Sequence, residues 1–228
     1  MSRAILIVGM HRSGTSCLAG GLEEAGLALG EVITEAPHNA KGNRESRRIM
    51  ALHDAILAHS GGSWDVPPAE LRFTDEHRRA RDEILRGYGG RDPFGFKDPR
   101  TLVTLPLWLE VLPAPAFVGS FRHPRQVVES LVRRNGGDPG RWLALWLDHA
   151  LRLLRLHAAR PFPLVRFDVP EERYAARVHE VAAELGLPHP ERAAFFERSL
   201  RHHEGEGGEP LPAEVEAAFA ALRERAGA

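Results

Sequence analysis

The fold of this chain is decided by residues 5–16, which read Ile5-Leu6-Ile7-Val8-Gly9-Met10-His11-Arg12-Ser13-Gly14-Thr15-Ser16. A short apolar run is typical of a buried parallel strand. It ends in a glycine turn, after which we expect a helix to begin at Thr15 or Ser16. Free backbone N–H groups and the positive end of the helix dipole point into such a loop. The segment therefore predicts a strand, an anion-binding loop and a helix.

The loop has the length of a phosphate-binding GxxxxGK[ST] loop, but Thr15 stands in place of the lysine. Arg12 is its only cation, and we expect it to neutralise the charge of a phosphate or phosphosulfate. The expected donors are the backbone N–H groups of Ser13, Gly14, Thr15 and Ser16. Magnesium-dependent nucleotide hydrolysis also needs a carboxylate at a later strand end, where this chain has Arg122. The alternative is a tight strand-to-helix turn with a Thr or Ser cap.

Composition excludes several classes of protein. The 228 residues carry 30 Lys+Arg and 31 Asp+Glu, a balance that gives no reason to expect nucleic-acid or membrane binding. Cys17 is the only cysteine, so neither an intrachain disulfide nor a cysteine-rich metal site can form. The 12 histidines show no metal-ligand spacing, and we expect no bound metal. Without a visible signal peptide or bilayer-spanning apolar run, we expect a cytoplasmic protein.

Strand patterns alternate with helix patterns along the chain, which predicts an α/β fold. We expect a three-layer α/β/α architecture with a central parallel sheet of four to five strands, like that of P-loop NTPases. The expected strands are 5–8, 94–97, 116–121 and 162–167. The expected helices are 15–26, 44–60, 75–88, 102–112, 124–134, 142–158, 170–186 and 212–226.

A second anion site is predicted where the strand 116–121 ends. Arg122 follows this strand directly, and Ser130 lies one or two turns into the next helix. An arginine at the carboxyl end of a strand lines the crevice where open α/β sheets bind ligands, and its planar fork suits a phosphate. A strand-end ion pair and a solvated serine are the alternative. Two anion sites at two strand ends imply a ligand with two phosphate groups.

The loop 9–16, together with Arg122-His123-Pro124 and Ser130, resembles the paired signatures of the sulfotransferase family that uses 3′-phosphoadenosine 5′-phosphosulfate (PAPS). The resemblance implies PAPS as co-substrate without a required metal. The loop would hold the 5′-phosphosulfate, and Arg122 and Ser130 the 3′-phosphate. Many members carry lysine where Arg12 stands. Weaker matches extend the resemblance over residues 3–190: Lys97-Asp98-Pro99-Arg100, Leu145-Trp146-Leu147, Val165-Arg166-Phe167-Asp168 and Leu185-Gly186-Leu187-Pro188.

Three further site residues follow from the resemblance. Arg134, from the basic glycine-rich segment 133–141, is expected to contact the 3′-phosphate. Lys97 and Arg12 would steady the transferring group, although an ion pair between Lys97 and Asp98 is an equal alternative.

The catalytic base is predicted from the loop before the second helix. Sulfuryl transfer needs a group that takes the proton of the acceptor. Glu45 is the first candidate, because related bacterial members carry a similar Gly-x-x-Glu there. A glutamate in the first turn of a helix is also favoured by the helix dipole alone. His38 in the same loop is the second candidate.

Other side chains are assigned to structure. We expect Asp168 to cap the helix that Pro170 opens, and Trp142 and Trp146 to lie in the core. Trp64 is a possible contact of the acceptor or of adenine. Residues 1–200 are expected to form a PAPS-binding domain, to which the polar segment and helix of 201–228 belong.

Sulfuryl transfer to a hydroxyl, or to an amine, is thus the expected activity. The acceptor could be a small molecule, a saccharide or a lipid, held by the loops 34–43 and 60–75. Two alternatives remain open: a magnesium-dependent P-loop kinase or nucleotide hydrolase, and a non-catalytic nucleotide-binding protein. The sequence does not predict the oligomeric state.

Overall fold

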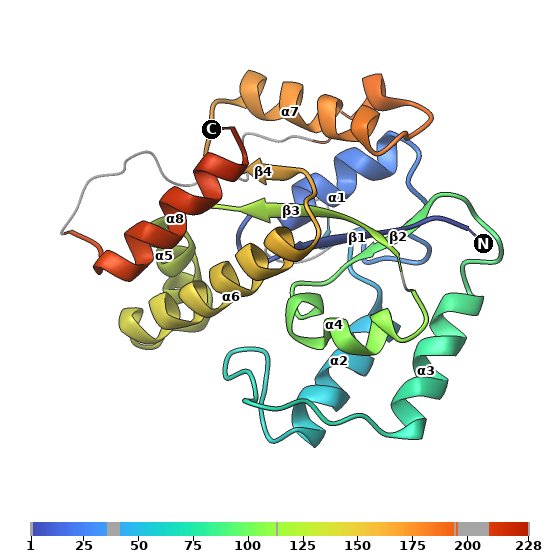
Figure 1. Cartoon of the computed structure of the whole chain (residues 1–228), viewed down its shortest axis with the longest axis horizontal. Helices are drawn as coiled ribbons and strands as arrows, with labels where there is room; N and C mark the ends of the chain where they lie inside the picture. Colours follow the sequence, from blue (N-terminus) through green and yellow to red (C-terminus); the bar gives the residue numbers. More distant parts are fainter. Residues whose placement is uncertain (1, 36–41, 113, 194, 196–209, 228) are drawn as a thin grey trace.

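A four-stranded parallel sheet forms the centre of the computed structural model, which describes residues 2–35, 42–112, 114–193, 195 and 210–227 (Figure 1). Its strand order is β2-β1-β3-β4. The strands are β1 (Ala4–Gly9), β2 (Phe94–Lys97), β3 (Ala116–Phe121) and β4 (Leu164–Arg166). The expected parallel α/β fold is confirmed, with four strands in the described ranges.

Helices cover both faces of the sheet, so the fold has the three expected layers (Figure 1). Helices α1 and α7 lie on one face, and α4 and α6 on the other. The helices are α1 (Thr15–Glu24), α2 (Arg47–His59), α3 (Asp75–Arg86), α4 (Thr101–Leu109), α5 (Pro124–Asn135), α6 (Pro139–Ala159), α7 (Glu171–Glu184) and α8 (Ala213–Arg225), with a short 3₁₀ turn at Pro190–Arg192.

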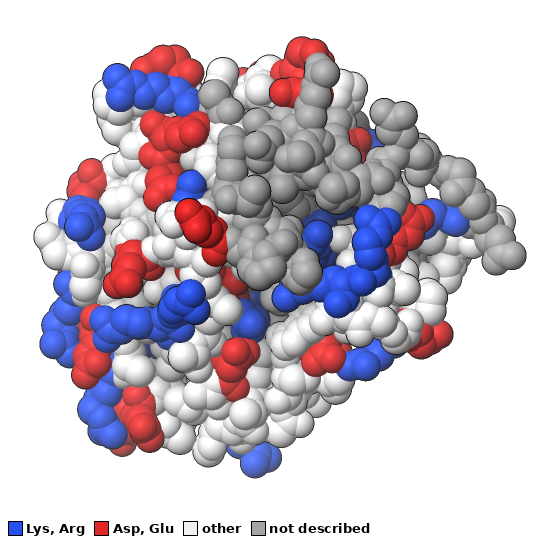
Figure 2. Space-filling model, turned by 180° about the vertical axis from the view of Figure 1, so that it is seen from behind, with Lys and Arg blue, Asp and Glu red and all other residues white. Residues whose placement is uncertain are grey.

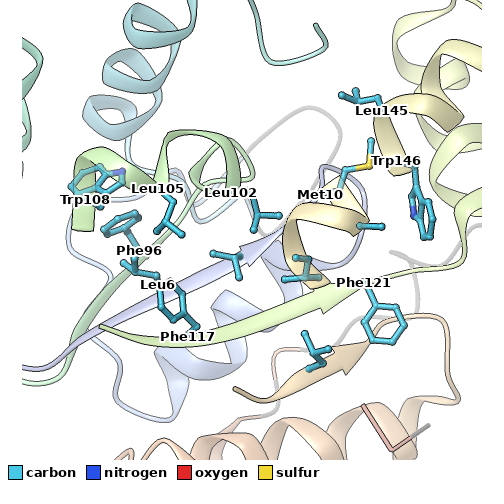
Figure 3. Close-up of a cluster of buried hydrophobic side chains, with 14 of the residues drawn as sticks. Leu6, Met10, Phe96, Leu102, Leu105, Trp108, Phe117, Phe121, Leu145 and Trp146 are labelled. Carbon is cyan, nitrogen blue, oxygen red and sulfur yellow. The ribbon is translucent and has the colours of Figure 1, made fainter. Parts of the chain in front are cut away.

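Strand β1 separates two hydrophobic cores because its side chains alternate between the faces of the sheet. Ile5 and Ile7 pack with residues of α1 and α7. Leu6 belongs to the larger core on the opposite face, together with Phe96, Trp108 and Trp146 (Figure 3). Both faces of β1 are fully buried, which explains the unbroken apolar run in the sequence.

One segment, residues 133–141, differs from the expectation. The range 133–141 is not one loop, because α5 continues to Asn135 and α6 already begins at Pro139. The side chain of Asp138 caps α6 by accepting a hydrogen bond from the backbone N–H of Arg141 at 2.8 Å. Arg134 therefore lies in the last helical turn of α5, where its direction is fixed by the helix.

The strand order determines where a site can form. Chain connections run from β1 to β2 on one side and reach β3 on the other side, so β1 is the switch point of the sheet. The loop after β1 consequently lies between the carboxyl ends of β2 and β3. No helix in the described ranges combines the length and hydropathy that crossing a membrane requires.

Candidate functional site

The loop after β1 is held in place by its glycines and by a serine pair. Gly9 has a φ of 152°, and a Cβ there would lie 2.3 Å from the carbonyl oxygen of Ser120. Gly14 has a φ of 87°, and a Cβ there would lie 2.3 Å from the ring of Phe167. Ser13 Oγ donates to the carbonyl of Met10 at 2.6 Å, and Ser120 Oγ donates to the carbonyl of Ser13 at 2.6 Å. The side chain of Ser13 is therefore structural.

The helix that follows this loop begins with free N–H groups. Gly14 is the N-cap of α1 and has no side chain with which to cap it. The N–H groups of Thr15 and Ser16, the first two residues of α1, have no acceptor within the helix. The N–H of Ser13 instead faces the carbonyl of Met10 at 3.4 Å. The start of α1 thus offers backbone donors and a positive dipole end to an anion.

Arg12 joins the loop to α5. Its backbone is left-handed, with a φ of 65°, and its Nε donates to Ser130 Oγ at 2.7 Å across 118 residues. Burial, and then the charges of Arg134 and Arg133, lower the pKa of Arg12 below its ordinary value. Arg12, Ser130, Arg133 and Arg134 therefore form one basic cluster. Figure 2 shows Lys and Arg side chains gathered right of centre, on the side where α5 lies.

Arg122 directly follows β3 and is buried. Its Nε donates to Gln126 Oε1 at 2.9 Å, and its Nη1 lies 3.5 Å from the carbonyl oxygen of Arg12. The guanidinium also stacks on the ring of Phe167, 5.4 Å from the centroid. Arg122 is thus tied to the same loop as Arg12.

On the opposite side of the loop, Lys97 forms a buried ion pair with Glu45. Lys97 Nζ lies 2.6 Å from Glu45 Oε1 and 3.1 Å from Ser16 Oγ. Lys97 is 1% exposed and Glu45 is 7% exposed. The expected alternative, an ion pair between Lys97 and Asp98, is wrong because the side chain of Asp98 turns to other partners. The three side chains connect β2, the start of α1 and the segment before α2.

The backbone around Glu45 is fixed by a short pairing with the segment before it. The N–H of Ile33 donates to the carbonyl of Glu45 at 3.0 Å, and the N–H of Arg44 donates back to the carbonyl of Ile33 at 3.1 Å. Arg44, with a φ of 54°, also pairs with Glu23 of α1 at 3.1 Å. Glu45 is therefore held between α1 and β2 although it precedes the helix.

A buried polar network lies beside the Lys97–Glu45 pair and was not predicted as part of a site. Arg100 Nη1 lies 3.1 and 2.9 Å from the two carboxylate oxygens of Asp98, and His53 Nδ1 lies 3.3 Å from Asp98 Oδ1. Burial alone would raise the pKa of Asp98, but His53 and Arg100 together lower it below its ordinary value. Asp98 and Arg100 order the turn around Pro99, because the backbone N–H of Arg100 donates to Asp98 Oδ1.

Trp64 makes two aromatic contacts beside the loop. The ring of Trp64 lies 4.7 Å from that of His11 and is stacked on that of Trp142 at 5.8 Å. Burial, and then the charge of Arg100, lower the pKa of His11 well below its ordinary value. Trp142 and Trp146 are buried, as expected. Trp64 packs against His11 and Trp142 beside the loop, on the side of α6.

Two other residues predicted from the sequence are Asp168 and His38. Asp168 does not cap α7, whose N-cap is Pro170 without a side-chain bond. It instead accepts the backbone N–H of His123 at 3.1 Å and pairs with Arg166 at 2.6 Å, which fixes the start of α5 against β4. His38 lies outside the described residues. Among the described residues, no group of three or more His, Cys, Asp and Glu side chains could hold a metal.

The sequence carried a signal for some of the missed residues. Asp98 and Arg100 lie in a short polar turn directly after a buried strand, a place where ligand-binding residues gather. His11 lies within the loop itself. His53 carried no signal, because a single histidine on an amphipathic helix has many uses.

Comparison with known proteins gives a distant likeness. No protein-family model matches the chain, and no curated protein matches its sequence. Among solved structures, the sulfotransferase STF1 from Mycobacterium tuberculosis is similar over 99% of this chain and 76% of that chain, at 15% identity and a TM-score of 0.40.

Proposed function

We propose that this protein is a sulfotransferase that moves a sulfuryl group from PAPS to the hydroxyl of an acceptor. The proposal is carried by one observation: the loop after β1 lies between a cluster of three arginines on one side and the Lys97–Glu45 pair on the other. A donor with two anionic groups and an acceptor with a removable proton would need these two kinds of chemistry side by side.

The arginine side would hold the nucleotide. The backbone N–H groups of Gly14, Thr15 and Ser16 suit the 5′-phosphosulfate, because a helix N-terminus favours anions. Arg122, Ser130 and Arg134 would hold the 3′-phosphate. Arg12 contacts Ser130 through Nε, so its remaining guanidinium N–H groups can serve an anion at either position. The Arg12–Ser130 distance of 2.7 Å supports one continuous bisphosphate site.

The opposite side would carry the chemistry. In an in-line transfer, the bond between sulfur and the bridging phosphate oxygen breaks while a bond forms from sulfur to the acceptor oxygen. Glu45 would take the acceptor proton, and Lys97 would stabilise the negative charge on the sulfuryl oxygens. For this, Lys97 has to turn from Glu45 toward the donor. A small-molecule, saccharide or lipid hydroxyl would each satisfy the chemistry.

Thermal unfolding with 3′,5′-adenosine bisphosphate, compared with ATP and each with or without Mg²⁺, tests the proposal. A ligand at one hundred times its dissociation constant stabilises the folded state by about 2.7 kcal/mol. For a chain of this size, the midpoint should rise by roughly 5–11 °C. We expect this rise with the bisphosphate alone, independently of Mg²⁺.

Other outcomes separate the alternatives. A rise only with ATP and Mg²⁺ would assign the protein to the kinases or nucleotide hydrolases. No rise with either nucleotide would contradict the anion site itself. A rise with the bisphosphate, but no transfer from labelled PAPS to any acceptor, would leave a nucleotide-binding protein without catalysis.

A further inference from the structure

The polar network around Asp98 takes no part in the proposed chemistry, although it lies directly beside it. His53, Asp98 and Trp108 are each 0% exposed, and Arg100 is 8% exposed. His53 and Asp98 contact other groups of the protein rather than solvent. Buried polar groups are costly unless they are paired, so the pairing of these groups favours one arrangement of their elements.

The hydrogen positions in this network follow from chemistry. Trp108 Nε1 donates to His53 Nε2 at 2.9 Å. Since an indole nitrogen can only donate, His53 Nε2 carries the lone pair, and the proton of the neutral ring is on Nδ1. That Nδ1–H faces Asp98 Oδ1 at 3.3 Å. The orientation of His53 is therefore determined by Trp108 of α4.

Asp98 is held from a second side by Arg100. The backbone N–H of Arg100 donates to Asp98 Oδ1 at 2.8 Å, while Arg100 Nε pairs with Asp54 Oδ1 at 2.8 Å. Burial opposes the charge of Arg100, but Asp98, Asp54 and Glu45 raise its pKa above the ordinary value. The neighbouring residues His53 and Asp54 of α2 thus both contact the turn that follows β2.

Ile49 and His53 are four residues apart on one face of α2, and Glu45 precedes this helix by two residues. Ile49 is fully buried on this face. Glu45 binds Lys97, and eight residues later His53 faces Asp98. The segment from Glu45 through α2 therefore contacts two consecutive residues at the end of β2.

We propose that His53 is a positioning residue, which acts through Asp98 to hold the Lys97 ammonium against Glu45. The inference rests on the proposed function for its catalytic meaning, but the geometry it describes can be measured without any substrate. Without the contact to Asp98, the turn and the start of α2 can move independently. A displacement of about 1 Å at reacting groups can lower turnover on the order of a hundredfold.

Two amide variants separate the two nitrogens of His53. In His53→Asn, the amide N–H takes the place of Nδ1–H and can still face Asp98. In His53→Gln, the longer amide takes the place of Nε2 and loses that donor. Both variants remove the imidazole and keep a polar group, so each serves as the control for the other.

The composition of the chain allows a direct readout. It contains only two lysines, Lys41 and Lys97, besides its 28 arginines. In a Lys41→Arg background labelled with ¹⁵N-lysine, a single side-chain ammonium signal reports Lys97. We expect His53→Asn to preserve its chemical shift and slow hydrogen exchange, and His53→Gln to accelerate that exchange at least tenfold. Equal signals in the two folded variants would overturn the proposal.

A measurement on the unchanged protein stands independently of how the variants fold. In ¹⁵N-histidine spectra, the buried His53 should show the tautomer with its proton on Nδ1. A proton on Nε2 would contradict the contact with Asp98 and hence the positioning role.

Activity gives the last readout. If the chain transfers sulfuryl groups, His53→Gln should lower kcat by about tenfold to a hundredfold and leave the affinity for 3′,5′-adenosine bisphosphate unchanged, while His53→Asn stays near the parent. Changed nucleotide affinity with unchanged kcat would overturn the role. If no variant transfers a sulfuryl group but the Lys97 signal responds as expected, the proposed function fails and the positioning role stands.

Discussion

The two sides of the loop after β1 contain similar residues but differ in net charge: the α5 side is positive, and the β2 side is a neutral ion pair. On the α5 side, Arg12 faces Arg133 and Arg134, and their charges lower its pKa. On the β2 side, Lys97 is paired with Glu45 at 2.6 Å. Both sides also carry a serine hydroxyl bonded to the cation, Ser130 on the first and Ser16 on the second.

This difference in charge predicts how each side responds to a bound anion. A group of cations that repel each other is stabilised when an anion arrives, so the α5 side should gain most from ligand binding. In a buried ion pair the two charges already neutralise each other, and removing one partner leaves the other charge uncompensated. The α5 side should therefore control affinity, and the β2 side should control the stability of the fold.

The largest expected effect is on the buried pair. Lys97→Met or Glu45→Leu alone should each lower the free energy of unfolding by about 3–5 kcal/mol, because the other charge stays buried without its partner. The double variant should be much closer to the parent, since both charges are removed. Urea unfolding of the four proteins measures the coupling.

A matched substitution on the other side sharpens this comparison. Arg12→Met should change the free energy of unfolding by less than about 1 kcal/mol, because the lost bond to Ser130 is offset by relief of repulsion. Additive effects of the two β2-side substitutions, or an equally large effect of Arg12→Met, would contradict the proposed division between the two sides.

The next effect is on ligand affinity. Arg12→Gln and Arg134→Gln should each weaken the binding of 3′,5′-adenosine bisphosphate by roughly tenfold to a hundredfold, the range for one charge-assisted hydrogen bond. Titration calorimetry at fixed salt gives the dissociation constants. Arg79→Gln on the exposed surface of α3, far from the carboxyl ends of the strands in Figure 1, is the control and should bind as the parent does. Equal losses in all three variants would indicate a general charge effect.

The sequence was sufficient for the features that depend on local pattern. The apolar run of β1, the glycine turn and the start of α1 were all predictable, because a buried strand and a helix start each have a local signal. The start of α6 was also encoded, since Asp138 is an N-cap and Pro139 suits the first helical position. The two glycines before them led to the expectation of a longer loop.

The contacts of the site could not be predicted in the same way. Glu45 and Lys97 are 52 residues apart, and Arg12 and Ser130 are 118 apart, so both contacts depend on the strand order β2-β1-β3. Asp168 is a case in which a local sequence signal predicts the wrong partner. Its sequence context fits a helix cap, but Arg166 and the backbone of His123 provide stronger tertiary partners.

The smallest expected effect is the dependence of the free energy of unfolding on pH, and it also distinguishes the two sides of the loop. His11 faces Arg100, Asp98, His149 and Lys97, and its burial lowers its pKa in the folded state. The unfolded chain, with a histidine pKa of about 6.5, then binds more protons below that pH. The free energy of unfolding should therefore fall as the pH drops below about 6.5, with His11 contributing up to about 1.4 kcal/mol per pH unit.

Replacing single histidines tests this assignment. In urea unfolding between pH 7 and pH 5, His11→Gln should have a flatter pH dependence than the parent. The same change at His189, whose side chain is 46% exposed, is the control and should alter the slope less. Arginines stay protonated throughout this range, so bisphosphate affinity on the α5 side should follow only the titration of the ligand. A slope unchanged by His11→Gln would mean that this histidine takes up its proton within the folded protein, and that the buried side of the loop tolerates an additional charge.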